Sequence, residues 1–311
     1  MTIGIAAFGA DAGRAILAGL AAVEAVGSGE IRGFAVFRAL GPEGALIDAE
    51  TQDGGGAALR ASLQRRGLLA AAEAAAVAAL ISSGPDRPEP LIQFLPGSAA
   101  GLVTGHRLPN TAGTDGAPLN LAALRRLEAG ETPEAAVAAV IGGNPEIDAG
   151  LIAVAPGAVG LAETARVLRR NDRGRALLLL PGGGAGVAVL HNAIQPFEGL
   201  ALLAAGSARA VLEAARPPLP AFRILSGTRV EFGGEDGVWL GEDGTLLRIT
   251  GGNPGLARYC GWTSSAVYLG TPVHRGGRRV GVTVGEARCR LDRGLVEEVD
   301  PAWPEVRWLP D

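Results

Sequence analysis

The segment Gly101-Leu-Val-Thr-Gly-His-Arg107 decides the fold, because it opens the densest run of polar side chains in an otherwise apolar chain. It predicts a strand, which is followed by a helix over about Asn120–Ala129 with Asn120 as the N-cap and Gly130 just past the end. Thr132-Pro133 predicts the start of a second helix, and the run Gly142-Gly-Asn-Pro145 stops it.

Two strands are expected after this helix pair. Leu151-Ile-Ala-Val154 and Val159–Val167 lie on either side of a Pro156-Gly157 turn. A helix pair laid on a β-hairpin forms one half of an α+β sandwich. We therefore expect Thr104 and His106, which share a strand face, at the mouth of that sandwich.

The remainder of the chain divides at the proline-rich segment Arg216-Pro-Pro-Leu-Pro220. Residues 1–218 are expected to form a layered α+β sandwich with a largely antiparallel sheet, because their strands are apolar on both faces and need cover on both. Residues 219–311 carry short strands with turn signals, and all four tryptophans lie there. This pattern indicates a β-rich C-terminal domain or extension, with a β-meander over 280–299.

Composition excludes several classes of protein. The net charge is −4 with no basic block, so we expect no nucleic-acid partner. The apolar runs are too short or too interrupted to span a bilayer, and Arg14 breaks the only stretch resembling a signal core, which predicts a cytoplasmic protein with no membrane partner. All 28 basic residues are arginines. Pyridoxal-phosphate enzymes, P-loop nucleotide hydrolases and Ser–Lys amidases each need a lysine, so these three classes of enzyme are excluded.

Neither the cysteines nor the histidines indicate a cofactor. Cys260 and Cys289 belong to no CxxC pair; a disulfide between them stays open, but two buried free thiols fit a cytosolic protein better. His106, His191 and His274 form no HxH or HExxH cluster. We therefore predict no metal and no other cofactor.

Polar residues interrupt two of the apolar strands. Glu163 shares a face with valine and leucine, so we predict that it is mostly buried and hydrogen-bonded. Its carboxylate needs hydrogen bonds or a raised pKa; it is either structural, satisfied by a cross-strand arginine or a helix N-terminus, or a site residue. Arg166 has the opposite parity and is no obvious intrastrand partner. His191 and Asn192 interrupt the strand Val187–Ile194, one on each face. They predict either a satisfied core histidine or a His–Asn pair in a crevice between layers.

Part of the chain resembles a known superfamily. The run GLVTGHRLPN, the helix pair NLAALRRLEAG–ETPEAAVAAV and the strands GLIAVAP–GAVGLAETARV are similar to the core of the N-terminal-nucleophile (Ntn) hydrolases. The chain looks most like bacterial families of unassigned function that are distantly similar to isoaspartyl peptidases and asparaginases. The resemblance covers roughly residues 1–215 and implies a four-layer αββα sandwich. In active members a Thr, Ser or Cys at the start of a strand becomes the N-terminal residue of the chain and is the nucleophile, and its own α-amine is the general base for amide hydrolysis.

Three threonines match the nucleophile that the resemblance implies. Thr2 begins the first strand and is exposed if the residue before it is removed. Thr104 lies in the strand most similar to the catalytic one, and Thr114 follows Gly113 as in self-cleaving members. In the continuous chain none of the three has a free α-amine. Thr104 is preferred because Gly105 follows it, leaving room for a substrate carbonyl, and because His106 could relay the proton in an uncleaved chain.

Three functions stay open from sequence. The first is an Ntn-like hydrolase of small-molecule or peptide-like amides, with a threonine nucleophile. The second is a non-catalytic small-molecule-binding or scaffold protein on the same fold. The third is a conventional hydrolase in which His106, His191 and Glu163 converge on a crevice; a homo-oligomer is compatible with each. The candidate catalytic residues are Thr104, His106, Glu163, His191 and Thr2, and the candidate substrate-binding residues are Gly105, Arg107, Asn192 and Arg166.

Overall fold

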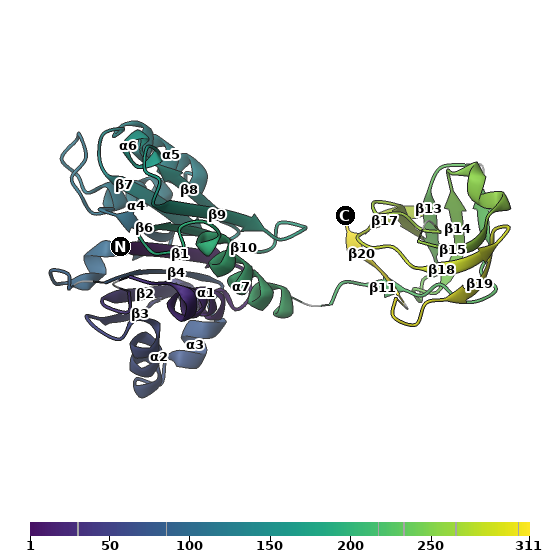
Figure 1. Cartoon of the computed structure of the whole chain (residues 1–311), viewed down its shortest axis with the longest axis horizontal. Helices are drawn as coiled ribbons and strands as arrows, with labels where there is room; N and C mark the ends of the chain where they lie inside the picture. Colours follow the sequence, from purple (N-terminus) through teal and green to yellow (C-terminus); the bar gives the residue numbers. More distant parts are fainter. Residues whose placement is uncertain (30, 85, 217, 233, 265, 304) are drawn as a thin grey trace. The chain divides into compact units, whose positions relative to one another are not determined.

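The protein consists of two compact units, each with a hydrophobic core of its own. The computed structural model describes residues 1–29, 31–84, 86–216, 218–232, 234–264, 266–303 and 305–311. The units are Met1–Arg216 and Pro217–Asp311, and the division falls in the proline-rich segment. The first unit mixes helices with strands and the second is rich in strands (Figure 1), which confirms the predicted α+β class.

The first unit holds all seven α-helices of the described residues and ten strands. In chain order these elements are β1 (Thr2–Phe8), α1 (Ala12–Val26), β2 (Ala35–Leu40), β3 (Leu46–Thr51), α2 (Gly55–Arg65), α3 (Leu69–Ala74), β4 (Val77–Ser83), β5 (Gly97–Ser98), β6 (Gly101–Arg107), α4 (Leu119–Glu128), α5 (Pro133–Gly142), β7 (Ala149–Ala155), β8 (Ala158–Glu163), α6 (Ala165–Leu168), β9 (Arg173–Leu179), β10 (Gly186–Asn192) and α7 (Leu200–Ala214).

The strands of this unit form two sheets. The larger has the order β3-β2-β4-β1-β10-β9, and the smaller has the order β5-β6-β7-β8. Every pairing in both sheets is antiparallel, as the sequence predicted. The N-terminal strand β1 lies inside the six-stranded sheet between β4 and β10, so its residues are paired on both sides.

Three apolar cores hold the first unit together. One lies between the six-stranded sheet and α1 and α7, and includes Ile5, Leu20 and Val189. A second lies between the two sheets and includes Leu102 and Leu190. The third lies between the four-stranded sheet and the helices α4 and α5, which cover its outer face in Figure 1. Strands apolar on both faces are buried on both faces, which explains their lack of polar alternation.

Three local predictions are confirmed: the start of α5, the glycine just past α4 and the turn between β7 and β8. Thr132 accepts a hydrogen bond from the Ala135 N–H and caps α5. Gly130 adopts a left-handed φ of 86° just past α4. Residues 156–157 form the two-residue turn between β7 and β8, with Ala155 paired to Ala158.

Two other local predictions are wrong. The N-cap of α4 is Pro118; Asn120 lies inside the helix, where its buried side-chain amide donates to the Gln93 carbonyl. The strand predicted to reach Val167 ends at Glu163 instead. Thr164 accepts a hydrogen bond from the Val167 N–H and begins the short helix α6, because a threonine hydroxyl satisfies the free amides of a helix start.

The second unit contains two sheets around one core. One has the order β11-β20-β17-β16-β13-β14-β12 and the other β15-β18-β19. Their strands are β11 (Ala221–Phe222), β12 (Val230–Phe232), β13 (Gly237–Leu240), β14 (Leu246–Gly251), β15 (Cys260–Thr263), β16 (Pro272–Arg275), β17 (Arg278–Thr283), β18 (Cys289–Asp292), β19 (Leu295–Val299) and β20 (Val306–Pro310).

The expected meander over 280–299 is wrong, because β17 belongs to the larger sheet while β18 and β19 pair in the smaller one. The residue after β17, Val284, donates to the Arg307 carbonyl, and the chain then leaves the larger sheet. Both cysteines are free thiols, as expected, but the expectation that both are buried is wrong: Cys289 is buried and Cys260 is exposed. Among the described residues, no helix has the length and hydropathy of a membrane span.

Candidate functional site

Polar side chains from both sheets of the first unit gather at one end of the space between them. On the six-stranded sheet, Thr2, Asn192 and Arg173 lie opposite one another on β1, β10 and β9. On the four-stranded sheet, His106 and Glu163 lie on either side of Gly150. Side chains alternate between the two faces of a strand, so Asn192 points to the same side as Leu190, and His106 to the same side as Leu102. Both leucines lie in the core between the sheets, so both sets of polar residues face the space between the sheets. We call these five residues, Thr2, His106, Glu163, Arg173 and Asn192, the inter-sheet cluster.

A glycine brings His106 and Glu163 together although their strands do not pair. His106 Nε2 lies 3.3 Å from Glu163 Oε1, and both side chains are fully buried. Gly150 of β7 lies between them, and a Cβ there would lie 2.4 Å from His106 Nε2. The absence of a side chain at Gly150 therefore allows contact across two strand spacings.

Arg173 links the two sheets. Its Nη1 donates a hydrogen bond of 2.9 Å to Glu163 Oε2, from β9 of one sheet to β8 of the other. The prediction that Glu163 is buried and hydrogen-bonded is thus confirmed. The Arg173 side chain is 22% exposed, so it is the member of this ion pair that reaches solvent.

The cluster also contains buried polar atoms without hydrogen-bond partners among the described residues. These include both side-chain atoms of Asn192, both ring nitrogens of His106 and Nε of Arg173. Such groups are rare inside proteins, because each unpaired one costs about 1–3 kcal/mol. Their concentration at one point distinguishes this end of the space between the sheets from the apolar core beside it.

Thr2 lies at the start of β1, directly opposite both Asn192 and Ser83. Only 4% of its surface is exposed. Ser83 donates to the Met1 carbonyl and accepts a 3.0 Å hydrogen bond from Arg87 Nη2, so the chain around the Met1–Thr2 bond is held in place. Cleavage of that bond would place an α-amine in the same row as Asn192.

Thr104 does not lie at the mouth of the sandwich, contrary to expectation. It is fully buried, and its hydroxyl donates a 2.8 Å hydrogen bond to the Leu80 carbonyl of the opposite sheet. The room expected at Gly105 is also filled, because β6 and β1 pack backbone to backbone there. A Cβ on Gly4 would lie 2.5 Å from the Gly105 carbonyl oxygen. The missing side chain of Gly4 therefore allows the close approach of the sheets, whereas a Cβ on Gly105 would meet the Gly150 carbonyl oxygen of its own sheet at 2.1 Å.

His191 does not converge with His106 and Glu163, so the third of the functions left open, which requires these three residues in one crevice, is wrong at His191. Its parity matches Val187 and Val189, which pack against the helices, while its neighbour Asn192 faces the other sheet. Burial lowers the pKa of His191 to about 4, and the charge of His106 adds to this; Glu163, Asp172 and the Phe197 carbonyl oppose it. The imidazole is therefore neutral at pH 7.

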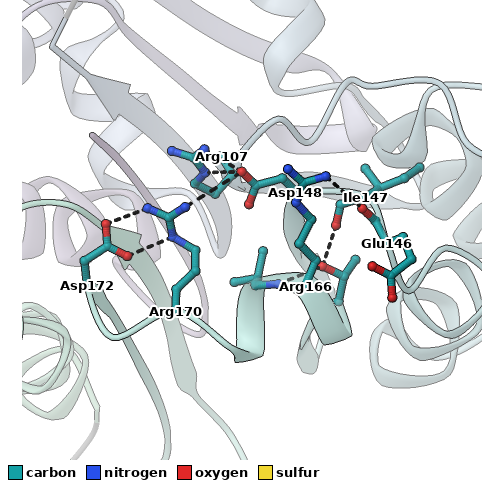
Figure 2. A network of polar contacts seen from close by, with 9 residues as sticks. Arg107, Glu146, Ile147, Asp148, Arg166, Arg170 and Asp172 are labelled. Carbon is teal, nitrogen blue, oxygen red and sulfur yellow. Dashed lines mark hydrogen bonds and ion pairs between the residues drawn. The ribbon is translucent and has the colours of Figure 1, made fainter.

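Three other candidate residues lie outside the cluster. Arg107 ends β6, and its Nε donates a 2.9 Å hydrogen bond to Asp148 (Figure 2). Arg166 lies on α6 and donates to the Glu146 carbonyl at 3.3 Å. Thr114 is exposed before α4, where its N–H donates to the Asn144 side chain.

Arg173 is the member of the cluster that sequence reasoning missed. In the structure a glycine lies opposite each of two histidines, Gly174 opposite His191 and Gly150 opposite His106, but these pairings depend on strand registers that the sequence does not reveal. Glycine inside a strand often marks the close approach of another group, and Arg173 is the residue before Gly174.

No group of three or more histidine, cysteine or acidic side chains among the described residues could hold a metal ion.

An apolar cavity of about 380 Å³ lies at the opposite end of the first unit. Phe8, the last residue of β1, lines it together with Leu40, Val77 and Pro156. Since Thr2 is the first residue of the same strand, the full length of β1 separates this cavity from the inter-sheet cluster.

Comparisons with known proteins give two family matches. A family model described as "Domain of unknown function (DUF6963)" matches residues 2–221. A second, described as "Domain of unknown function (DUF7259)", matches residues 227–302, within the second unit. No curated protein sequence matches the chain.

Proposed function

The chain belongs to the family described as domain of unknown function DUF6963, and we propose that its first unit is an αββα sandwich of the Ntn-hydrolase type that hydrolyses amide bonds. The order of its packed layers supports this proposal. The cores join α1 and α7 to the six-stranded sheet, that sheet to the four-stranded sheet, and the latter to α4 and α5.

The position of Thr2 carries the functional part of the proposal. Thr2 is the first residue of an interior strand, and its row includes Asn192, whose amide has no hydrogen-bond partner among the described residues. Thr2 is a better nucleophile candidate than Thr104, because the Thr104 hydroxyl already donates to a backbone carbonyl and is fully buried. Cleavage of the Met1–Thr2 bond would provide the base, since the new α-amine belongs to the residue that carries the hydroxyl.

The reaction follows from these groups. Thr2 Oγ1 attacks the carbonyl carbon of the amide, and the α-amine accepts the hydroxyl proton. The C–N bond breaks, the amine product leaves with that proton, and an ester remains on Thr2. Water then hydrolyses the ester, releases the acid and restores the hydroxyl. The Asn192 amide is the donor best placed to stabilise the oxyanion.

The test combines intact mass with a screen of small amides and acidic dipeptides. We expect the mass to show cleavage before Thr2, and Thr2→Ala to lower turnover by at least about 1,000-fold while Thr2→Ser retains part of it. Thr114→Ala is the matched control, since Thr114 is exposed outside the cluster. Equal turnover in Thr2→Ala and wild type would refute Thr2 as the nucleophile.

A second candidate function is the binding of a small apolar molecule without catalysis. The cavity lined by Phe8, Leu40 and Val77 favours it, because pockets of this size and apolar lining accept small ligands. Gly184 also lines the cavity, and a Cβ there would meet no atom within 4 Å. Gly184→Leu should therefore abolish binding in a fragment titration without unfolding the protein, and unchanged binding would exclude this cavity.

A further inference from the structure

Four charged side chains form a continuous chain beside the inter-sheet cluster. Arg107 Nε donates to Asp148 Oδ2 at 2.9 Å, and Arg170 Nη1 lies 4.0 Å from the same oxygen. Arg170 also binds both oxygens of Asp172, at 2.8 and 2.6 Å. We call Arg107, Asp148, Arg170 and Asp172 the charged bridge; Figure 2 shows Arg170 between the two carboxylates.

The charged bridge connects the two sheets next to the cluster. Arg107 follows His106 on β6, and Asp148 precedes β7 of the same four-stranded sheet. Asp172 precedes Arg173, the first residue of β9 in the six-stranded sheet. Arg170 hydrogen-bonds Asp172 and forms a longer ion pair, of 4.0 Å, with Asp148, so it is the residue through which the two ends are joined.

Two residues of unusual backbone conformation lie where the bridge attaches. Arg107 has a φ of 64° and Ala193 a φ of 55°, a left-handed region that residues other than glycine rarely adopt. Each directly follows a cluster residue, His106 or Asn192. Asp148 holds the Arg107 side chain, and the Asp172 carbonyl accepts a 2.6 Å hydrogen bond from the Ala193 N–H. Strain of this kind persists only where the surroundings impose it, and it concentrates at functional sites.

The bridge is ionised at neutral pH. Burial opposes the charge on Asp148, yet the hydrogen bond and charge of Arg107, with Arg170 and Arg166, hold the pKa of its carboxyl below the usual value. The hydrogen bond from Arg170 lowers the pKa of Asp172 in the same way, against the effect of burial.

We propose that Arg170 is a positioning residue for the inter-sheet cluster. By binding Asp148 and Asp172 together, it holds His106 and Glu163 of one sheet against Arg173 and Asn192 of the other. This inference rests on the proposed function, because positioning matters to turnover only if the cluster is a site. A shift of about 1 Å between the sheets would move His106 and Glu163 of the four-stranded sheet relative to Thr2 and Asn192 of the six-stranded sheet.

Kinetics test the proposal with a matched pair of variants. Arg170→Met removes the guanidinium and keeps the length of the side chain; Arg169→Met makes the same change next to it, where Arg169 pairs with Glu146 on the surface. We expect Arg170→Met to lower kcat by about 10- to 100-fold with a much smaller change in KM, Arg170→Lys to recover part of it, and Arg169→Met to leave both constants unchanged. Unchanged kcat in Arg170→Met would overturn the proposal.

A second readout separates this inference from the proposed hydrolase activity. The chain has three histidines, of which His106 lies in the cluster and His274 in the second unit. We expect Arg170→Met to shift the imidazole NMR signals of His106 and to leave those of His274 in place, while Arg169→Met changes neither. If no amide is hydrolysed but the His106 signals shift, the positioning stands and the activity fails. If the His106 signals do not move, the positioning fails whatever the activity.

Discussion

Glu163 places a carboxylate inside the first unit, and its partners keep it there. One oxygen accepts from Arg173 across the gap between the sheets, and the other faces His106. Its burial could be predicted from its apolar strand face. Arg173 could not, because its contact with Glu163 depends on how two separately hydrogen-bonded sheets dock, and strand parity carries no information about that.

Glu163→Ala should lower the free energy of unfolding by about 1–3 kcal/mol, because it leaves Arg173 and His106 without their buried partner. Urea denaturation at pH 7 measures this. Glu146→Ala is the control, since that carboxylate is 74% exposed and its pair with Arg169 should contribute about 0–1 kcal/mol. Equal effects of the two substitutions would contradict the structural role of Glu163.

His191 should make the first unit less stable in mild acid. Its pKa is about 4 in the folded chain and about 6.5 when unfolded, so the unfolded state binds the proton more readily. The stability is therefore complete above about pH 6.5 and falls as the pH drops towards 4. The lowered pKa values of Asp148 and Asp172 act in a more acidic window, because their stabilisation is complete above the ordinary carboxyl pKa and is lost as the pH falls from there through the lowered pKa of the folded chain.

We expect wild type to lose about 2 kcal/mol of unfolding free energy between pH 7 and pH 5 through His191, a loss that His191→Gln lacks. Urea denaturation at the two pH values compares them. Parallel pH dependence in both proteins would show that His191 is protonated as easily in the folded chain as in the unfolded one.

At the level of elements, sequence patterns located the helix pair, the turn at residues 156–157 and the antiparallel strands. They failed at the end of β8, because Ala165 and Val167 continue the apolar alternation beyond the strand. What ends the strand is Thr164, whose hydroxyl caps α6 and also donates to the Ile147 carbonyl. That second contact comes from a loop before β7, and local periodicity cannot report it.

The contact between β1 and β6 should tolerate no side chain at Gly4. Gly4→Ala would place a methyl group 2.5 Å from a backbone oxygen, and we expect a loss of about 1–3 kcal/mol by thermal or urea unfolding. Gly206→Ala is the matched control: it lies in α7 with no neighbour within 4 Å of the added methyl group. There the same change should stabilise by up to about 1 kcal/mol, since alanine favours helix over glycine. Effects of the same sign would contradict this account.

At the scale of the whole molecule, each unit has the core it needs to fold alone. The three cores of the first unit contain residues of that unit only, and the fourth core belongs to the second. We expect a fragment ending at residue 220 to unfold cooperatively in urea and to show the same loss with Glu163→Ala as the full chain. A fragment without a cooperative transition would show that the first unit depends on the second.

The position of β1 inside its sheet has a consequence for biosynthesis. Its two partners are β4 (Val77–Ser83) and β10 (Gly186–Asn192), so one edge of β1 finds its partner only after about one hundred further residues have left the ribosome. At about 5–20 residues per second this interval lasts roughly 5–20 s. For that time the nascent chain carries an apolar strand with unpaired amides and carbonyls, the kind of edge that joins other chains. Misassembly during translation should therefore concentrate on β1, and chaperone dependence should end when β10 emerges.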